Sequence, residues 1–570
     1  MIRINKMLLR FALSYIGLLS FGIIGDGAAA SGITYTQNPV TYPLGQTITY
    51  NKATCGGTLS NVFISPALPD GLILHSTTGT IFGLPTQIVG STAYTVSGTC
   101  SGAQVTTTLT LGIGDAPTAY YVDNVNGNDA NDGHTQATAW KSLTKVNNAT
   151  LGPNTSVRFK RGGVWRGQLV LRSGSSAGGL YYDAYGTGPA PVLMGSVSAS
   201  DPTGWTPNFW KGWAPSGTGG WTNVAGNIWK SNMTFAPLPG YANGMPYNSA
   251  NDVGNIIYNP TPTTIATGVE AMTGLPGAYD RKLTQLTSNL TSPGMWLFNK
   301  TDWKVYLYST SNPATAFPNL ELAINTNVIN AYNGSASYVY LQNFQIKYGA
   351  GSGVYTAFNA SHVTFHDLQI SYIGGGNLGG HGTRYGDAIN FYGNADNDLV
   401  ERVTSSQIYD GGPNNQADGP NITVHDITYR NNIVWNTITP SFMFFNGSAN
   451  VVSNIFVENN TFVGTDTWSV NQRTNGNQQF GLYLPLGGNP TVSNIVYKNN
   501  AFYNFKGCGI VMNTFSQWKG ILTMDNNDWL SSAGLSSTNV CTPAGLTTIS
   551  SWSPTYPAEQ HGIELNPNFV

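Results

Sequence analysis

Charged residues are scarce in this chain of 570 residues: Asp, Glu, Lys and Arg together make up 9% of it, against roughly 25% in ordinary globular domains. The net charge is −2, and no block of basic residues stands out. Because nucleic acids and anionic membranes bind clustered basic charge, neither is an expected partner. Disorder is not expected either, since hydrophobic residues make up 41% of the chain and aromatic residues 12%.

Apolar stretches long enough to cross a bilayer are lacking after the first thirty residues. Those thirty combine a basic start, an apolar run at 11–24 and a series of small residues that ends at Ala30. This pattern is typical of a secretory signal peptide, so we expect residues 1–30 to be removed and the protein to be secreted without a membrane span. An anchor helix that stays uncut is the alternative.

Cysteine is rare, with four residues in the chain. Cys55 and Cys100 flank one small β-rich region, whereas Cys508 and Cys541 lie towards the C-terminus. In an exported protein this arrangement predicts two local disulfides, Cys55–Cys100 and Cys508–Cys541. Neither spacing resembles a zinc site, so no metal site is expected at the cysteines.

A phrase that recurs through the second half of the chain is its strongest feature. Apolar and polar residues alternate, a polar pair such as Asn-Asn breaks the alternation, and an apolar pair follows. The clearest copies are VHDITYRNNIVWN (424–436), VSNIFVENNTFVG (452–464) and VSNIVYKNNAFYN (492–504). A period of two predicts half-buried strands, and recurrence every 20–50 residues predicts a solenoid whose coils stack. We expect the stacked Asn432, Asn460 and Asn500 to form an internal ladder of amides.

Residues 33–115 form a separate unit of short alternating strands with turn residues between them, which favours a β-sandwich. Its segment LPDGLILHSTTGTIFGLPT (68–86) resembles the Ig-like domains of bacterial secreted proteins, whose phrase is Leu-Pro-x-Gly-Leu, then Thr-Gly-x-Ile-x-Gly and Pro-Thr. The resemblance implies a spacer or accessory module without active-site residues. Carbohydrate binding is the alternative.

A second resemblance begins at residue 119. The segments AYYVDNVNGNDANDGHTQATAWKSLTKVN (119–147) and SVRFKRGGVWRGQLVL (156–171) resemble the opening of right-handed parallel β-helix proteins of the pectate-lyase-like superfamily. The resemblance implies that 119–570 is a β-helix, capped near its start by a short helix at about 138–147. A cap is needed because an open end exposes unpaired strand edges. That superfamily holds both lyases and hydrolases, and we find the defining motif of neither.

Two regions of the predicted β-helix call for separate interpretations. Asp129, Asn131 and Asp132 could bind Ca²⁺, although a network of turn hydrogen bonds is the interpretation we favour, and no other cofactor is expected. Residues 200–330 interrupt the periodicity and are rich in Trp and Pro, which indicates an insertion. We expect its aromatic residues to build its own core; stacking on sugar rings is the alternative.

Two long excursions predict where a functional site lies. One falls between Ile373 and Asp387, the other between Gly464 and Phe480, and both are expected to leave the solenoid at the same corner. Because the rungs between them have short loops, the excursions would form the walls of a cleft on one flank. The residues expected to bind substrate there are His381, Arg384, Tyr392, Asn415, Gln416, Asn446, Trp468, Gln472, Arg473 and Tyr483.

Carboxyl groups of this cleft are the candidate catalytic groups. Asp387 and Asp410 fall at corresponding corners of adjacent rungs, which lie about 4.8 Å apart in such sheets, and Glu401 is the reserve. Hydrolysis of a glycosidic bond needs such a pair, one to protonate the leaving oxygen and one to activate water or attack. The alternative role of both aspartates is to cap turns.

The sequence therefore favours a secreted, monomeric enzyme that cleaves an extracellular polysaccharide, with hydrolysis ahead of elimination. Elimination would need a base and a cation, for which His381, Arg384, Arg473 and Tyr483 are the candidates. A non-catalytic protein that binds glycans at a cell surface is the alternative from another class.

Overall fold

The computed structural model describes residues 32–548 and His561, with gaps. Outside the described residues lie 45, 47, 84, 86–88, 115–116, 177, 208–213, 237–252, 259–270, 274–289, 300, 357, 378–383, 418–420, 438–441, 447–449, 465–479, 485–490, 506–507, 513–517, 519, 531–538 and 543–544. The predicted signal peptide precedes this range. None of the helices in the described part has the length and apolar character that a membrane crossing requires. Contacts divide the chain into two units: residues up to Val40 with Tyr50–Gly112, and Thr41–Thr49 with the rest.

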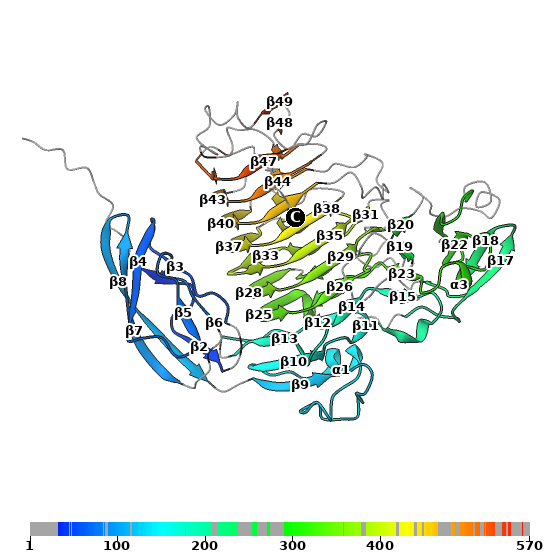
Figure 1. Ribbon diagram of the computed structural model, residues 1–570, viewed down its shortest axis with the longest axis horizontal. Coiled ribbons are helices and arrows are strands. Elements are labelled where there is room, and N and C mark those ends of the chain that lie inside the picture. The colour runs from blue at the N-terminus through cyan, green and yellow to red at the C-terminus, as the bar shows by residue number, and fades with distance from the viewer. Residues whose placement is uncertain are drawn as a thin grey trace, which may run out of the picture. The chain divides into compact units, whose positions relative to one another are not determined.

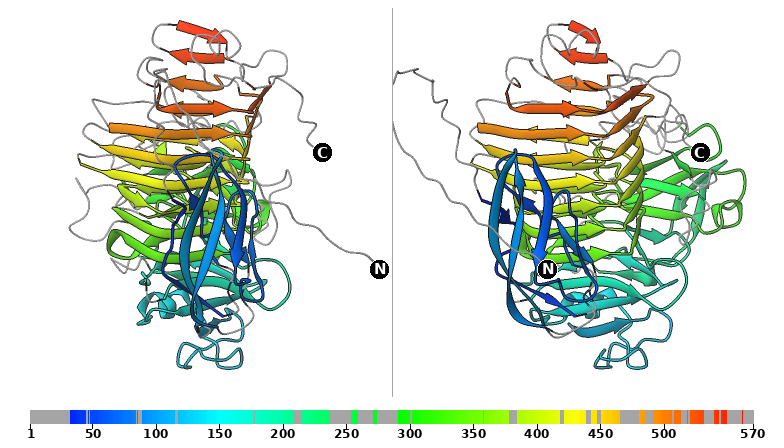
Figure 2. Two further views of the ribbon diagram at one scale, coloured as in Figure 1. Left: turned by 90° about the vertical axis from the view of Figure 1, so that its left-hand side faces the viewer. Right: turned by 60° about the vertical axis from the view of Figure 1, so that its left-hand side comes forward.

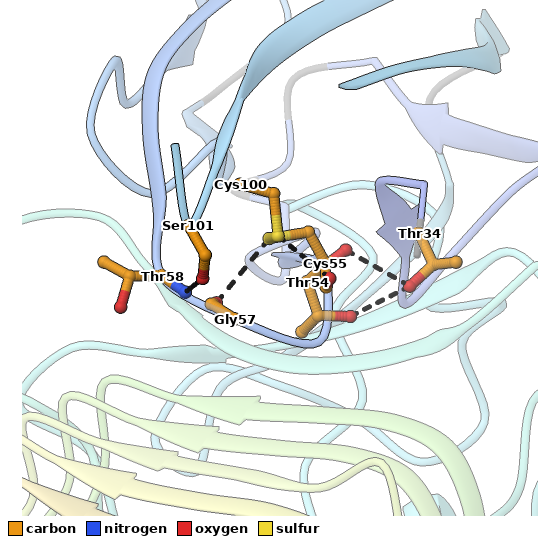
Figure 3. Close-up of a disulfide and its surroundings, with 7 residues drawn as sticks. All are labelled: Thr34, Thr54, Cys55, Gly57, Thr58, Cys100 and Ser101. Atoms are coloured by element: carbon orange, nitrogen blue, oxygen red, sulfur yellow. Dashed lines mark hydrogen bonds between the residues drawn. A yellow bond between two sulfur atoms is a disulfide. The ribbon is translucent and has the colours of Figure 1, made fainter. Parts of the chain in front are cut away.

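The first unit carries the predicted β-sandwich topology of short antiparallel strands. Its strands are β1 (Thr34–Tyr35), β2 (Val40–Pro43), β3 (Ala53–Thr54), β4 (Leu59–Ser65), β5 (Leu72–Leu74), β6 (Ile81–Gly83), β7 (Val89–Cys100) and β8 (Ala103–Gly114), of which β2, β8, β7 and β4 form one sheet. Cys55 and Cys100 form the predicted disulfide, close to the pairing of β1 with β3 (Figure 3). Cys508 is also disulfide-bonded; the side chain of its predicted partner Cys541 lies outside the described residues.

The second unit is the predicted right-handed parallel β-helix (Figures 1 and 2). Each coil contributes a strand to each of three sheets, which we call sheets 1, 2 and 3. Sheet 1 consists of β9 (Thr118–Val122), β10 (Thr155–Lys160), β13 (Leu180–Tyr185), β25 (Ser335–Gln342), β28 (Asn359–His366), β33 (Asn394–Asp396), β34 (Leu399–Glu401), β37 (Thr423–Arg430), β40 (Val451–Glu458), β43 (Thr491–Lys498) and β46 (Leu522–Asp525).

Sheets 2 and 3 follow in every coil. Sheet 2 consists of β16 (Trp205–Thr206), β11 (Val164–Gly167), β14 (Val192–Met194), β26 (Gln345–Lys347), β29 (Gln369–Ile373), β35 (Thr404–Ile408), β38 (Ile433–Thr437), β41 (Thr461–Val463), β44 (Ala501–Tyr503) and β47 (Asp528–Leu530). Sheet 3 consists of β12 (Leu169–Leu171), β24 (Ile329–Ala331), β27 (Val354–Tyr355), β32 (Ile389–Tyr392), β36 (Pro413–Ala417), β39 (Phe442–Asn446), β42 (Leu482–Leu484), β45 (Ile510–Met512), β48 (Asn539–Thr542) and β49 (Gly545–Thr548).

Stacked apolar side chains fill the interior of the β-helix. In sheet 1, Ile427, Ile455 and Ile495 occupy equivalent positions of three successive strands and are fully buried. The alternation seen in the sequence thus places one face of each strand in the core. Burial of such side chains, at roughly 25 cal/mol per Å² of apolar area, is what holds one coil on the next.

The repeated Asn-Asn pair forms the corner between sheets 1 and 2. The first asparagine of each pair takes a positive φ, 57° at Asn459 for example, a conformation that Asn adopts more readily than most residues. The second forms the predicted ladder: the Nδ2 of Asn432 donates to Oδ1 of Asn460 at 2.9 Å, and that of Asn460 donates to Oδ1 of Asn500 at 3.0 Å. The ladder continues to Asn527. The prediction of a structural amide ladder is confirmed.

A short helix packs at the start of the β-helix, as expected, but α1 (Leu143–Asn148) begins later than predicted. The carboxylate of Asp129 accepts hydrogen bonds from the backbone of Lys141 and Ser142 and from the Ser142 hydroxyl. These bonds hold the preceding residues in a turn, so the helix starts after Ser142, its N-cap. The favoured interpretation of Asp129 as part of a turn network is confirmed.

The insertion forms antiparallel strands around its own core. These elements are β15 (Ser196–Ser198), β17 (Trp221–Ala225), β18 (Ile228–Ser231), β19 (Val253–Tyr258), β20 (Ala271–Thr273), β21 (Trp296–Asn299), β22 (Lys304–Tyr308), α3 (Pro313–Ala316) and β23 (Glu321–Ile324). Trp205, Trp221 and Trp296 are buried in one apolar cluster. The expectation that the aromatic residues build the insertion's core is confirmed for these three.

Candidate active site on sheet 3

Both long excursions leave the β-helix at the same corner, as predicted. The first runs from the end of β29 to β32, and the second from the end of β41 to β42, so each connects sheet 2 to sheet 3. Asp387 lies at the end of the first. Asp410 lies one rung further along, in the short turn between β35 and β36. The two turns are bonded to each other, since the backbone N–H of Asp410 donates to the carbonyl of Gly386 at 3.0 Å.

Strands β32 and β36 follow directly after the two aspartates and form the floor of the site. They pair in parallel, with Asn390 opposite Asn414 and Tyr392 opposite Gln416. On β32, Ile389 and Phe391 alternate with Asn390 and Tyr392 and belong to the apolar core. Because side chains alternate across a strand, Asn390, Tyr392, Asn414 and Gln416 share the outer face of sheet 3.

The Asp387 carboxyl is buried and binds amides on both of its oxygens. Its Oδ1 accepts from the backbone N–H of Gly411 at 2.9 Å, and its Oδ2 accepts from Nδ2 of Asn390 at 2.8 Å. The residue is 2% exposed. The bond to Gly411 matches the ladder asparagines, whose side-chain oxygens also accept a backbone N–H from a neighbouring coil. One carboxyl oxygen of Asp387 therefore supports the turn, which was the alternative role expected for it.

The pKa of Asp387 is raised to about 8, first because burial disfavours the charged carboxylate and second because Asp410 lies nearby with its own negative charge. The amides of Gly411, Asn414 and Asn390 favour the charged form and oppose this rise without cancelling it. No lysine, arginine or histidine is among the described groups that shift this pKa. At neutral pH the Asp387 carboxyl is consequently protonated and able to give up a proton.

Buried amide atoms without partners lie around this carboxyl. Within the described part of the protein, Oδ1 of Asn390 and Oδ1 of Asn414 have no hydrogen-bond partner, whereas the amide nitrogen of Asn414 faces the Asp387 carboxyl and favours its charged form. Both asparagines are buried, Asn414 completely. Since more than about 90% of buried polar groups in proteins are paired, these atoms call for a bound water or for polar groups of a ligand.

Two predicted residues are corrected by the structure. Asn415 points into the β-helix, where its Oδ1 accepts from the hydroxyl of the core residue Tyr429. The prediction placed Asn415 and Gln416 on one surface, but side chains of adjacent strand residues face opposite ways. Asn415 is therefore not a substrate-binding residue.

Glu401 is the second correction, because it ends a strand of sheet 1 and not of sheet 3. Its buried carboxylate forms ion pairs with Arg402 at 3.0 Å and Arg430 at 3.2 Å. In the register of sheet 1 it stands in a column of alternating charge with Arg430, Glu458 and Lys498. Its role is to pair charges between neighbouring coils, so it is not a reserve for Asp387 and Asp410.

Most of the other predicted residues cannot be placed at the level of side chains. His381, Trp468, Gln472 and Arg473 lie outside the described residues, as do the side chains of Arg384, Asn446 and Tyr483, so these seven stay predictions. Tyr392 and Gln416 lie on the outer face as expected, and Oε1 of Gln416 accepts from Nδ2 of Asn390 at 3.1 Å. Sequence reasoning missed Tyr355 and Phe358, which lie beside Tyr392, because their coil lacks the Asn-Asn phrase.

Comparisons with known proteins match the two units separately. Residues 23–114 match the family model described as Putative Ig domain, which confirms the Ig-like resemblance of the N-terminal unit. A stretch of 121 residues, 21% of the chain, is 32% identical to a lacto-N-biosidase of Bifidobacterium longum subsp. longum, but the stretch spans only 7% of that protein.

The solved structures that match this chain have a similar fold but are distant in sequence. XylC with xylose is 12% identical, with 73% of this chain and 67% of that chain covered and a TM-score of 0.45. A Yersinia enterocolitica family 28 exopolygalacturonase is 12% identical over 89% of this chain and 87% of its own, with a TM-score of 0.38. A GH136 lacto-N-biosidase of Eubacterium ramulus is 13% identical over 79% of this chain and 68% of its own, with a TM-score of 0.30. At these values nothing about function follows from the likeness.

Proposed function

We propose that this protein is a secreted glycoside hydrolase that cleaves an extracellular glycan between Asp387 and Asp410. In this mechanism the protonated Asp387 donates its proton to the glycosidic oxygen as the bond to the leaving sugar breaks. Asp410 activates a water molecule or attacks the anomeric carbon directly. The unpaired amide atoms of Asn390 and Asn414 are the groups that would bind sugar hydroxyls next to the pair.

The observation that carries the proposal is the buried carboxyl of Asp387, which lies beside Asp410. Elsewhere in the β-helix, Asn residues make the same bond to a backbone N–H of a neighbouring coil without any buried charge. At 387 the chain has a carboxyl that burial and Asp410 push to a pKa of about 8. Asp398 makes the same kind of bond with a buried carboxyl, so the bond alone does not distinguish Asp387. Its place beside Asp410, at the corner where the first excursion ends, is what favours proton transfer. The stretch of 32% identity to a lacto-N-biosidase adds support for a glycosidase.

A glycan panel tests the proposal. The secreted protein is incubated with neutral and uronate-containing polysaccharides, and both new reducing ends and the absorbance of unsaturated uronates are followed. We expect reducing ends without absorbance, because hydrolysis leaves no double bond. Asp387→Asn and Asp410→Asn should each lower the rate by about 10²-fold or more, at unchanged folding.

Asp426→Asn is a matched control, because Asp426 lies on sheet 1 at a φ of 57°, which Asn also adopts. It should keep the full rate. Absorbance that rises together with the reducing ends would show elimination, and full activity of both site variants would refute the assignment of the pair.

A further inference from the structure

Three aromatic side chains lie on sheet 3 and in the turn after β27, further along the strands than the proposed catalytic pair, and we call them the aromatic patch: Tyr355, Phe358 and Tyr392. Tyr355 is opposite Asn390 in the register of sheet 3, and Asn390 donates to Asp387. Tyr392 is two residues beyond Asn390, so it shares the outer face with it. The patch is thus on the coil that carries Asp387 and on the coil before it, about 4.8 Å away.

The three rings form one continuous surface. The centroids of Tyr355 and Tyr392 are 5.9 Å apart with an interplanar angle of 31°. The ring of Phe358 lies 6.5 Å from that of Tyr392, at 72°. Inward neighbours on the same strands, such as Val354 and Phe391, are fully buried, whereas Phe358 is 63% exposed. Phe358 thus extends the two partly buried tyrosine rings into a surface patch of three aromatic groups, which is a candidate for ligand binding.

Two glycines give the turn at Phe358 its room. A Cβ at Gly334 would lie 2.6 Å from Cδ2 of Phe358, and one at Gly393 would lie 2.8 Å from its carbonyl oxygen. Both glycines also have a positive φ, 70° and 94° respectively, which side chains disfavour. The backbone therefore passes close to the Phe358 side chain and backbone, and a side chain at either glycine would disturb the position of the exposed ring.

The chemistry of the patch indicates its ligand. Aromatic faces pack against the apolar C–H side of a sugar ring, and tyrosine adds a hydroxyl at the edge. The outer-face residues next to the patch, Asn390 and Gln416, are amides that can bond to sugar hydroxyls. Among the described residues, neither the three rings nor the amides of Asn390 and Gln416 carry a charge, so these groups favour an uncharged sugar ring.

We infer that the aromatic patch is a subsite that binds an uncharged pyranose ring of the glycan, roughly 16 Å along sheet 3 from the bond cleaved at Asp387 and Asp410, since Tyr392 lies five residues beyond Asp387. The inference rests on the proposed function and specifies its substrate class. It places the glycan along sheet 3, with the chain extending from the catalytic pair along the strands towards the aromatic patch.

The test is a binding measurement that needs no turnover. The Asp387→Asn protein is titrated calorimetrically with xylo-, cello- and N-acetyllactosamine-type oligosaccharides and with oligogalacturonides. We expect at least one neutral series to bind. Adding Phe358→Ala or Tyr392→Ala to this protein should weaken that binding tenfold or more, since removing one aromatic ring from a binding surface costs about this much affinity. Tyr392→Phe, which keeps the ring, should retain the affinity.

Phe63→Ala is the matched control, because Phe63 is 60% exposed and lies on β4 of the Ig-like unit; it should leave the affinity unchanged. Binding of oligogalacturonides alone, binding of no series, or unchanged affinity in the Phe358 and Tyr392 variants would overturn the subsite. These results are separate from a failure of the proposed function, which would appear as full cleavage by Asp387→Asn.

Discussion

Replacing Asp387 by Asn should make the β-helix more stable at neutral pH. The pKa of Asp387 is about 8 in the folded protein, whereas in the unfolded chain the carboxyl has its ordinary pKa of 3.8. Between these values the folded state binds more protons, so the stability of the wild-type protein falls as the pH rises. Since Asn cannot ionise, the stability of the variant does not fall with pH for this reason.

The size of the effect follows from the same shift. Each pH unit within the window changes the free energy of unfolding by up to about 1.4 kcal/mol, so three units from pH 4.5 to 7.5 give at most about 4 kcal/mol. The charge of Asp410 contributes to the raised pKa, so the two carboxyls titrate together. We therefore expect the free energy of unfolding of Asp387→Asn, relative to the wild type, to grow by about 2 to 4 kcal/mol over this range. At pH 4.5 the two proteins should differ little.

Urea unfolding at several pH values, followed by tryptophan fluorescence, measures this difference. Every tryptophan of the chain lies after residue 119, so the signal reports the β-helix and not the Ig-like unit. Parallel stability curves for the wild type and Asp387→Asn would refute a protonated carboxyl at this position.

Three further predictions concern residues away from the catalytic pair. Asn460→Ala removes four side-chain hydrogen bonds inside the ladder. Because buried partners are left unpaired, it should lower the free energy of unfolding in urea by about 3–5 kcal/mol. Asn494→Ala is the control: its hydrogen bond is exposed, so the loss should be under about 1 kcal/mol. Asp398→Asn should stabilise the protein at neutral but not at acidic pH, because burial raises the pKa of Asp398, as difference curves against pH would show. Glu401→Gln should leave the rate of glycan cleavage unchanged while lowering the urea midpoint, since Arg430 loses its buried partner.

The sequence was sufficient to predict the register of the coils. The Asn-Asn phrase marks the corner between sheets 1 and 2 in the later coils, so aligning Asn432, Asn460 and Asn500 also aligned the strands that follow. The same alignment placed the two excursions at one corner and brought Asp387 next to Asp410, although 23 positions separate them in sequence.

Other parts of the site depend on facts that the pattern does not contain. Asn415 was misplaced because a run of polar letters does not show which residue of a strand faces inwards. Glu401 was misplaced because its corner belongs to sheet 1, where Arg430 of the next coil determines its role. Tyr355 and Phe358 were missed because their coil lacks the Asn-Asn phrase by which the other coils were aligned.

A leaving-group comparison tests the proton transfer from Asp387 most directly. The Asp387→Asn protein is assayed on the glycan that the wild type cleaves and on the 2,4-dinitrophenyl glycoside of the sugar released. An acidic leaving group needs no proton, so we expect a loss of about 10²-fold or more on the glycan and a small loss on the aryl glycoside, whereas Asp410→Asn should lose both activities. Equal losses of Asp387→Asn on the two substrates would contradict the assignment of Asp387 as the proton donor.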